Sequence, residues 1–189
     1  NFELMICDVS DYQTVKRISR DIKRRKKPLK ALINAAGVAS MNMAVTTDQA
    51  SVQKLLQINL AGTIHCCQLF APIMLRSKKG VIINFSTIAV ALALKGESVY
   101  AASKAGVESF SRAFAREMAD FNVRVNCIAP GPIRTELLRG ISDSQIKNII
   151  SQQIIPKEFS KSDVCDIVEL LLDPKSASLS GQLLQIGGV

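Results

Sequence analysis

The chain has 189 residues, of which 48% are hydrophobic and 21% are charged, and it contains no Trp. These values fit one globular domain with a sizeable core and exclude an intrinsically disordered chain. The formal net charge of +8 is compatible with a nucleic acid, a membrane surface or an acidic partner. No zinc-finger spacing or aromatic RNA-binding motif accompanies it, so we do not expect nucleic-acid binding.

Short apolar runs alternate along the chain with segments of helix length. Strands separated by helices predict βαβ units, and hence an α/β fold with a doubly wound parallel sheet and helices on both of its faces. No linker or internal repeat divides the sequence, so residues 1–189 are expected to form a single domain. The predicted strands are 3–7, 29–33, 81–85, 123–128 and 183–186, and the predicted helices are 11–26, 48–76, 99–121, 143–152 and 162–172.

Polar and small residues follow several of these strands, and in such sheets ligands bind outside the carboxyl ends of the strands. Asp8 follows the first predicted strand, 34–37 the second, Ser86 the third and 130–135 the fourth. Residues of this kind gathered at one edge indicate a binding site more strongly than any one of them alone.

The sequence favours a cytoplasmic protein without a metal site. Five cysteines, at 7, 66, 67, 127 and 165, mostly sit in apolar stretches and are expected to be reduced. His65, Cys66 and Cys67 are consecutive, so on a helix their side chains point in different directions and cannot share one ion. No apolar run reaches the roughly 18 residues of a membrane span, and the first residues do not resemble a signal peptide.

The basic run 23–27 is read first as the solvated end of a helix, where cations oppose the negative end of the helix dipole. A localisation signal or a docking patch is the alternative reading.

Tyr100 and Lys104 are the strongest candidates for chemistry. Their spacing of four places the phenol and the ammonium on one face of a helix. A nearby cation stabilises a phenolate, so we expect Lys104 to lower the pKa of Tyr100 and to let the phenol exchange protons near neutral pH. The same spacing on a surface helix is commonly only a solvated pair.

Ser86 lies at the carboxyl end of an apolar strand, fourteen residues before Tyr100. Its hydroxyl is placed to stabilise charge that develops on the same substrate oxygen. A serine that simply forms a turn after the strand is the alternative interpretation.

Five motifs occur in an order and spacing that resemble the short-chain dehydrogenase/reductase family over nearly the whole chain. Among its members, the sequence is most similar to 3-oxoacyl-[acyl-carrier-protein] reductases. The motifs are Leu32-Ile33-Asn34-Ala35-Ala36-Gly37, Ile58-Asn59, Ile83-Asn84-Phe85-Ser86, Tyr100-Ala101-Ala102-Ser103-Lys104-Ala105 and Pro130-Gly131-Pro132-Ile133-Arg134-Thr135.

The resemblance implies a Rossmann-like fold and a nicotinamide cofactor, with NADP preferred and NAD possible. Tyr100 would be the general acid in reduction, Lys104 would hold the nicotinamide ribose, and Ser86 would orient the substrate carbonyl. Asn59 would anchor a water that links Lys104 to solvent. The implied catalytic residues are Asn59, Ser86, Tyr100 and Lys104, and the implied cofactor-binding residues are Asp8, Val9, Asn34, Ala35, Ala36, Gly37, Tyr100, Lys104, Pro130, Gly131, Ile133 and Thr135.

The sequence departs from the family pattern at both ends. The glycine-rich turn that cradles a pyrophosphate does not follow a strand at the start, and the first two strands, on the order of 50 residues, are absent. In a sheet ordered 3-2-1-4-5-6, strand 3–7 would then be separated from strand 29–33 by a gap. We therefore expect an N-terminally incomplete chain that binds dinucleotide weakly. Ile186 replaces the Asp of a common Asp-Gly-Gly ending.

Three functions remain open from the sequence. The first is reduction of a 3-oxoacyl group on an acidic acyl carrier protein, which Arg76, Lys78, Lys79, Arg112 and Arg116 would dock. The second is a dehydrogenase of another small alcohol, such as a polyol, sugar or steroid, with 135–156 as a substrate lid. The third is a catalytically silent binding protein. A homotetramer or homodimer is expected in each case.

Overall fold

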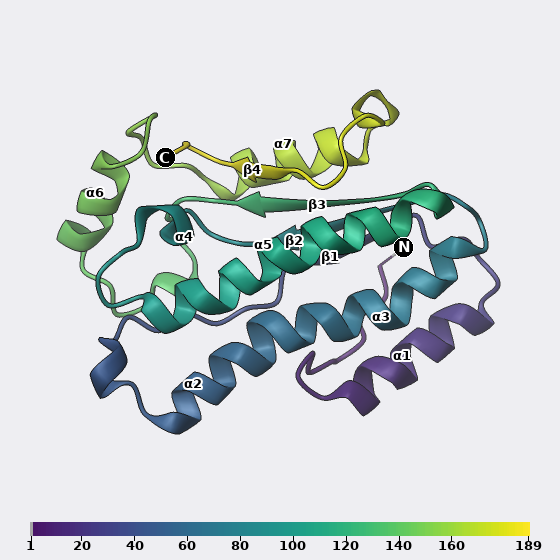
Figure 1. The fold of residues 1–189 in the computed structure, drawn as a ribbon, viewed down its shortest axis with the longest axis horizontal. Helices are drawn as coiled ribbons and strands as arrows, with labels where there is room; N and C mark the ends of the chain where they lie inside the picture. The colour runs from purple at the N-terminus through teal and green to yellow at the C-terminus, as the bar shows by residue number, and fades with distance from the viewer. Residues whose placement is uncertain (1) are drawn as a thin grey trace.

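A four-stranded parallel sheet in the order β1-β2-β3-β4 forms the centre of the fold in the computed structural model, which describes residues 2–189 (Figure 1). In its register, Ile83 of β2 lies between Ile33 of β1 and Asn126 of β3. The α/β class with a doubly wound, Rossmann-like sheet is therefore confirmed. The strands are β1 (Ala31–Asn34), β2 (Gly80–Phe85), β3 (Val123–Ala129) and β4 (Leu183–Gln185).

The helices lie close to the predicted segments, and several begin at side-chain caps. Asp11, Asp48, Ser142 and Ser160 each accept a hydrogen bond from the first turn of the helix that follows, as N-cap residues do. The α-helices are α1 (Tyr12–Arg24), α2 (Gln49–Leu55), α3 (Gly62–Leu75), α4 (Ala89–Leu92), α5 (Ser98–Met118), α6 (Asp143–Ser151) and α7 (Lys161–Leu172). Shorter helical segments are Ala44–Thr46, the π-helical η2 (Leu56–Ala61), Ala119–Phe121, Glu136–Leu138 and Pro174–Ser176.

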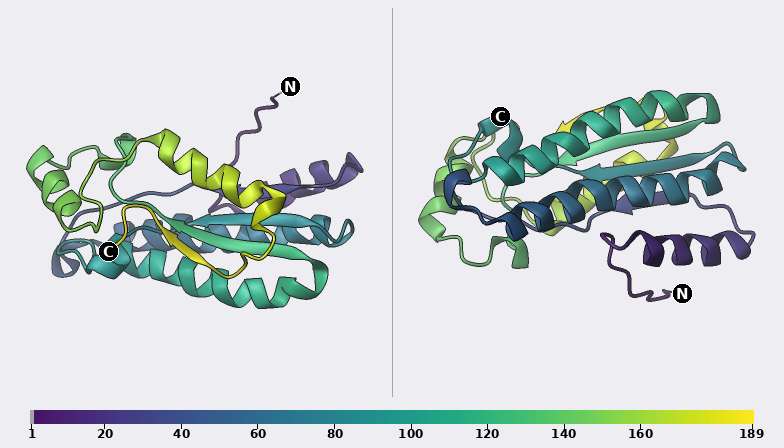
Figure 2. Two further views of the ribbon diagram at one scale, coloured as in Figure 1. Left: turned by 90° about the horizontal axis from the view of Figure 1, so that it is seen from above. Right: turned by 60° about the horizontal axis from the view of Figure 1, so that its bottom comes forward.

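Helices α3 and α5 cover one face of the sheet, and α7 covers the other (Figures 1 and 2). Consecutive side chains of β2 point to opposite faces of the sheet, as they do in any strand. Ile82 packs with Met74 and Phe114 on the face of α3 and α5, whereas Ile83 packs with Leu171 on the face of α7. Because both faces are covered, the central strands have the continuous apolar character that the sequence shows.

The segment Gln49–Leu75 joins α2, η2 and α3 into one long helix with a mean hydropathy of 1.4 over 18 residues. It is long and apolar enough to cross a membrane by length and composition alone. Half of this window is buried inside the fold, where α3 packs against α1 and the sheet. The helix therefore serves as a core helix of this domain.

The predicted strand at 3–7 is not formed. A strand needs a neighbour to satisfy its backbone N–H and C=O groups, and this segment instead extends away from the sheet beside α1 (Figure 2). Glu3 forms an ion pair with Arg25, while Leu4 and Ile6 are exposed. The expected gap within the sheet does not arise either, since β1 to β4 are contiguous and β1 is an edge strand.

The five cysteines are free thiols. Cys66, Cys67 and Cys127 are buried as expected, whereas Cys7 and Cys165 are exposed. Cys66 packs between α1 and α3, and Cys67 packs toward the sheet. Within residues 2–189, no three His, Cys, Asp or Glu side chains gather as metal ligands would.

Candidate functional site

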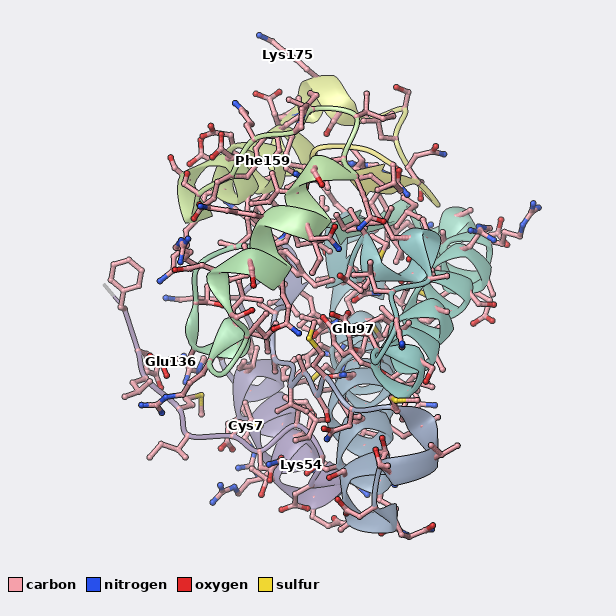
Figure 3. All side chains as sticks on the ribbon, turned by 90° about the vertical axis from the view of Figure 1, so that its left-hand side faces the viewer. Cys7, Lys54, Glu97, Glu136, Phe159 and Lys175 are labelled. Carbon is pink, nitrogen blue, oxygen red and sulfur yellow. The ribbon has the colours of Figure 1, made fainter. Side chains whose placement is uncertain are left out.

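A cavity of about 720 Å³ opens at the carboxyl end of the sheet, where α4 and α6 lie (Figure 1). Its walls are mainly apolar and come from loops that follow β1, β2 and β3, together with the first turns of α5. This size and character are typical of a small-molecule site. Figure 3 views the molecule from this end, with Glu97 near the middle and Glu136 and Phe159 farther out.

Tyr100 and Lys104 both line this cavity from one face of α5, one helical turn apart. Each of the two residues is only 6% exposed. The predicted common face of the helix is thus present, and both groups border space that a ligand can enter. Tyr100 packs with Leu55 and Ala89, which fix the ring beside the turn after β2.

The Lys104 ammonium is anchored by the strand next to it. Nζ donates a hydrogen bond of 2.9 Å to the carbonyl oxygen of Phe85, at the end of β2. Burial lowers the pKa of Lys104 to about 8, because an apolar environment disfavours the charged form. An ammonium has three donors, so two remain for a ligand in the cavity.

The expected influence of Lys104 on Tyr100 is not present in this arrangement. Burial raises the pKa of the Tyr100 phenol to about 12, and the carboxyl of Glu97 acts in the same direction, while a hydrogen bond from Thr87 opposes them. Lys104 is not among these causes, because with a pKa of about 8 it has lost its charge at the pH where the phenol titrates. The prediction of a lowered phenol pKa is therefore wrong for the protein without ligands, and Tyr100 holds its proton at neutral pH.

Two neighbouring hydroxyl groups follow β2, and they have different partners. Ser86 is buried, and its Oγ donates a hydrogen bond of 2.5 Å to a carboxylate oxygen of Glu108 on α5. Thr87 instead lies close enough to Tyr100 for its hydroxyl to lower the pKa of the phenol. Both residues line the cavity, but only Thr87 has its hydroxyl beside the phenol.

The sequence reasoning did not identify Thr87, Glu97 or Glu108. Ser86 and Thr87 both carry a hydroxyl at the end of the same strand. Their positions along the chain do not show which hydroxyl lies beside Tyr100. Glu97 had a detectable signal, because it stands one turn before Tyr100 at the start of the same helix. Glu108 stands one turn after Lys104, on the same face.

Asn59 is fully buried in the π-helical turn η2 and connects two segments of the site. Its Oδ1 accepts from the N–H of Val38 at 2.8 Å, and its Nδ2 donates to the Val38 carbonyl at 2.9 Å and to Ser103 Oγ at 3.0 Å. Both amide protons are thus in use. The side chain holds the loop after β1 against α5, and π-helical turns of this kind often occur at functional sites.

Eight of the twelve predicted cofactor-binding residues line the cavity, and four do not. Asn34 donates to Asn84 Oδ1 at 2.8 Å, so its side chain ties β1 to β2 rather than facing a ligand. Asp8 is exposed and accepts hydrogen bonds from Ser10. The residues in the cavity are Ala35, Gly37, Tyr100, Lys104, Pro130, Gly131, Ile133 and Thr135, and those outside it are Asp8, Val9, Asn34 and Ala36.

The cavity fits the nicotinamide end of a dinucleotide. A Cβ atom on Gly37 would lie 3.3 Å from Asn59 Oδ1 and 3.4 Å from Lys104 Nζ. The absence of a side chain therefore leaves the ammonium open toward the cavity. The lysine donors are suited to ribose hydroxyls. Within residues 2–189, no glycine-rich turn follows a strand to hold a pyrophosphate, so the described fit concerns the nicotinamide end alone.

Comparison with known proteins identifies relatives that match nearly the whole chain. Residues 1–188 match the family model described as enoyl-(acyl carrier protein) reductase. The 3-oxoacyl-[acyl-carrier-protein] reductase FabG of Staphylococcus aureus is 29% identical over 181 residues, which are 96% of this chain and 74% of the relative. Carbonyl reductase family member 4 of Xenopus laevis is 31% identical over 182 residues, which are 96% and 75%.

Two solved structures share the fold of this chain. The crystal structure of gox2181 matches with a TM-score of 0.89 and 26% identity, over 96% of this chain and 73% of that one. A structure of ElxO with NADP bound matches with a TM-score of 0.88 and 26% identity, over 97% and 76%. With the family model covering nearly every residue, the chain belongs to the short-chain dehydrogenase/reductase family of nicotinamide-dependent oxidoreductases.

Proposed function

We propose that this protein reduces a ketone to a secondary alcohol with NADPH. The observation that carries the proposal is the pair of hydroxyl groups, Tyr100 and Thr87, beside each other in an apolar cavity that the Lys104 ammonium also borders. Two hydroxyl donors at one point are suited to an oxygen atom that gains negative charge. A carbonyl oxygen gains such charge during reduction.

Tyr100 is the proton donor in this proposal. Its pKa of about 12 keeps the phenol protonated, so the resting side chain is ready to give a proton rather than to take one. The bound cofactor, when reduced, supplies the hydride. Tyr100 then delivers its proton to the substrate oxygen, which leaves a phenolate in the cavity.

Lys104 stabilises that phenolate and holds the cofactor ribose. Its pKa of about 8 leaves it charged at neutral pH, and its bond to the Phe85 carbonyl fixes it one turn from Tyr100. The ammonium contributes little to the resting phenol but favours the charge that appears after proton transfer. Asn59 positions the Val38 loop and Ser103 around this pair.

Thr87 takes the role that the family resemblance gave to Ser86. Orienting a carbonyl needs a hydroxyl that is near the proton donor and available to the cavity. The Thr87 hydroxyl lies near enough to the phenol to lower its pKa, whereas the Ser86 hydroxyl donates to Glu108. In this proposal Ser86 secures α5 to the end of β2, and Thr87 contacts the substrate oxygen.

Ketone reduction is preferred over reduction of a carbon–carbon double bond. The matching family model is described by an enoyl reductase, but the two relatives described above are named for 3-oxoacyl and carbonyl substrates. Hydrogen-bond donors clustered at one oxygen position favour the carbonyl reaction for this chain. The finer features of the proposal are NADP as cofactor, which the NADP-bound relative supports, a 3-oxoacyl thioester as first substrate, a homo-oligomer and a cytoplasmic location.

The test is consumption of NADPH and of NADH by the full-length protein with an acetoacetyl thioester and with a panel of ketones. The proposal predicts turnover of at least one ketone and faster turnover with NADPH. Reduction of enoyl thioesters without any ketone reduction would contradict it. Tight dinucleotide binding without turnover of either class would favour a silent binding protein instead.

A further inference from the structure

The cavity contains a buried carboxyl group that the proposed mechanism does not use. Glu97 lines the cavity and is 7% exposed, and it is the only buried carboxyl among residues 2–189. No hydrogen bond or ion pair to its side chain is formed within this described part of the chain. Among residues 2–189, the only fully enclosed side-chain polar atom without a partner is Gln153 Oε1, so the Glu97 carboxyl oxygens are accessible from the cavity, and the protein leaves them free for a ligand.

Glu97 stands at the start of helix α5, where its side chain does not cap the helix. Glu97 is the N-cap residue of α5, a position where the short polar side chains of Asp, Asn, Ser and Thr usually accept a hydrogen bond from the first turn of the helix. Only its backbone carbonyl does so, accepting from the N–H of Ala101 at 2.7 Å. The side chain makes no cap bond and borders the cavity instead. A structural reason for a glutamate here is therefore absent.

Glu97 also lies close to the reacting groups. Its charge raises the pKa of the Tyr100 phenol, and burial raises the pKa of Glu97 itself. The residues before and beside it, such as Leu94 and Ala89, form an apolar wall. A ligand in contact with Tyr100 is thus close to a hydrogen-bond acceptor that faces the same cavity and has no partner in the protein.

We propose that Glu97 is a specificity-determining residue that binds a hydrogen-bond donor of the substrate, such as a hydroxyl or amide N–H group near the ketone. A carboxyl accepts from such a donor in either protonation state. In its ionised state it repels a substrate carboxylate, because charges interact strongly where water is excluded. The site therefore selects ketones that carry a donor over plain ketones and over keto acids. This inference rests on the proposed ketone reduction.

The experiment compares kcat/KM for a straight-chain methyl ketone with that for its monohydroxylated analogues, in the wild-type protein and in two variants. Glu97→Leu removes the acceptor at similar size, and Glu97→Gln keeps an acceptor without the charge. We expect the wild type to prefer one hydroxyketone. The preference should fall at least about tenfold in Glu97→Leu and less in Glu97→Gln. Glu117→Leu, on an exposed part of the same helix, is the matched control and should keep the preference.

Thermal unfolding separates specificity from a structural role. Removal of an unpaired buried carboxyl should leave the unfolding temperature of Glu97→Leu unchanged or raise it, whereas loss of a structural partner would lower it. An equal preference in wild type and Glu97→Leu, or a clearly lower unfolding temperature of the variant, overturns the inference.

A binding measurement keeps the test independent of catalysis. If the wild type reduces no ketone, the proposed function fails, and the affinities of the same ketone and hydroxyketones are measured by ligand-observed NMR. Tighter binding of a hydroxyketone that Glu97→Leu abolishes would support the Glu97 site on its own. Equal affinity of both ligand types for the wild type would contradict it.

Discussion

Replacing Lys104 by methionine should stabilise the fold near neutral pH while it damages function. Lys104 is buried, and its pKa is lowered from the ordinary 10.5 to about 8. That difference corresponds to about 3 kcal/mol by which the folded protein disfavours the ammonium relative to the unfolded chain. Loss of the hydrogen bond to the Phe85 carbonyl offsets part of this gain, by about 1 kcal/mol.

The pH dependence gives the sharper test, because the lost hydrogen bond affects it little. The folded state binds fewer protons than the unfolded state between pH 8 and 10.5. The buried ammonium therefore lowers the free energy of unfolding of the wild type most below pH 8. This loss disappears as the pH rises from 8 to 10.5. The advantage of Lys104→Met should shrink by about 2 to 3 kcal/mol between about pH 7 and about pH 10.

Urea unfolding at several pH values measures the difference in free energy of unfolding between wild type and Lys104→Met. The contributions of the other titrating groups are the same in both proteins and largely cancel in this difference. Lys54→Met, at an exposed position on α2 (Figure 3), is the matched control and should show no such trend. Parallel stability curves for wild type and Lys104→Met would refute the claim that burial controls the charge of Lys104.

Two further predictions concern catalysis by the full-length protein. Ketone reduction should decline as pH rises through about 8, because Lys104 loses the charge that stabilises the Tyr100 phenolate, and a rate that increases over this range in steady-state assays would contradict that role. Thr87→Val should lower kcat by about a hundredfold to a thousandfold, as expected for loss of one donor at a developing oxyanion, while Ser86→Ala should retain most of kcat. The reverse order would return the substrate-orienting role to Ser86.

Sequence patterns predicted the central part of the fold because its elements are specified locally. The apolar runs that became β2 and β3 are buried on both faces, and helices α1 and α7 follow the polar N-cap residues Asp11 and Ser160. The segment 3–7 has a similar apolar character, but a strand depends on a partner strand as well as on its own residues. Its backbone finds no neighbour among the described residues, so local pattern alone gave the wrong answer.

The sequence predicted which motifs form the site, but it did not predict the contacts between their atoms. The spacing of Tyr100 and Lys104 gave their common helix face correctly. It could not show that the ammonium bonds the Phe85 carbonyl, or that burial controls the pKa of the phenol. The choice between the adjacent hydroxyls of Ser86 and Thr87 likewise depends on the turn after β2, which no spacing rule describes.

The proton-donor role of Tyr100 is tested most directly by comparing wild type with Tyr100→Phe in the reduction of a ketone by NADPH. The phenylalanine ring keeps the packing against Leu55 and Ala89 but has no proton to give. We predict that kcat falls at least about a hundredfold while the affinity for NADPH, measured by its fluorescence, stays within a few-fold of the wild-type value. Ketone reduction by Tyr100→Phe at close to the wild-type rate would contradict the account.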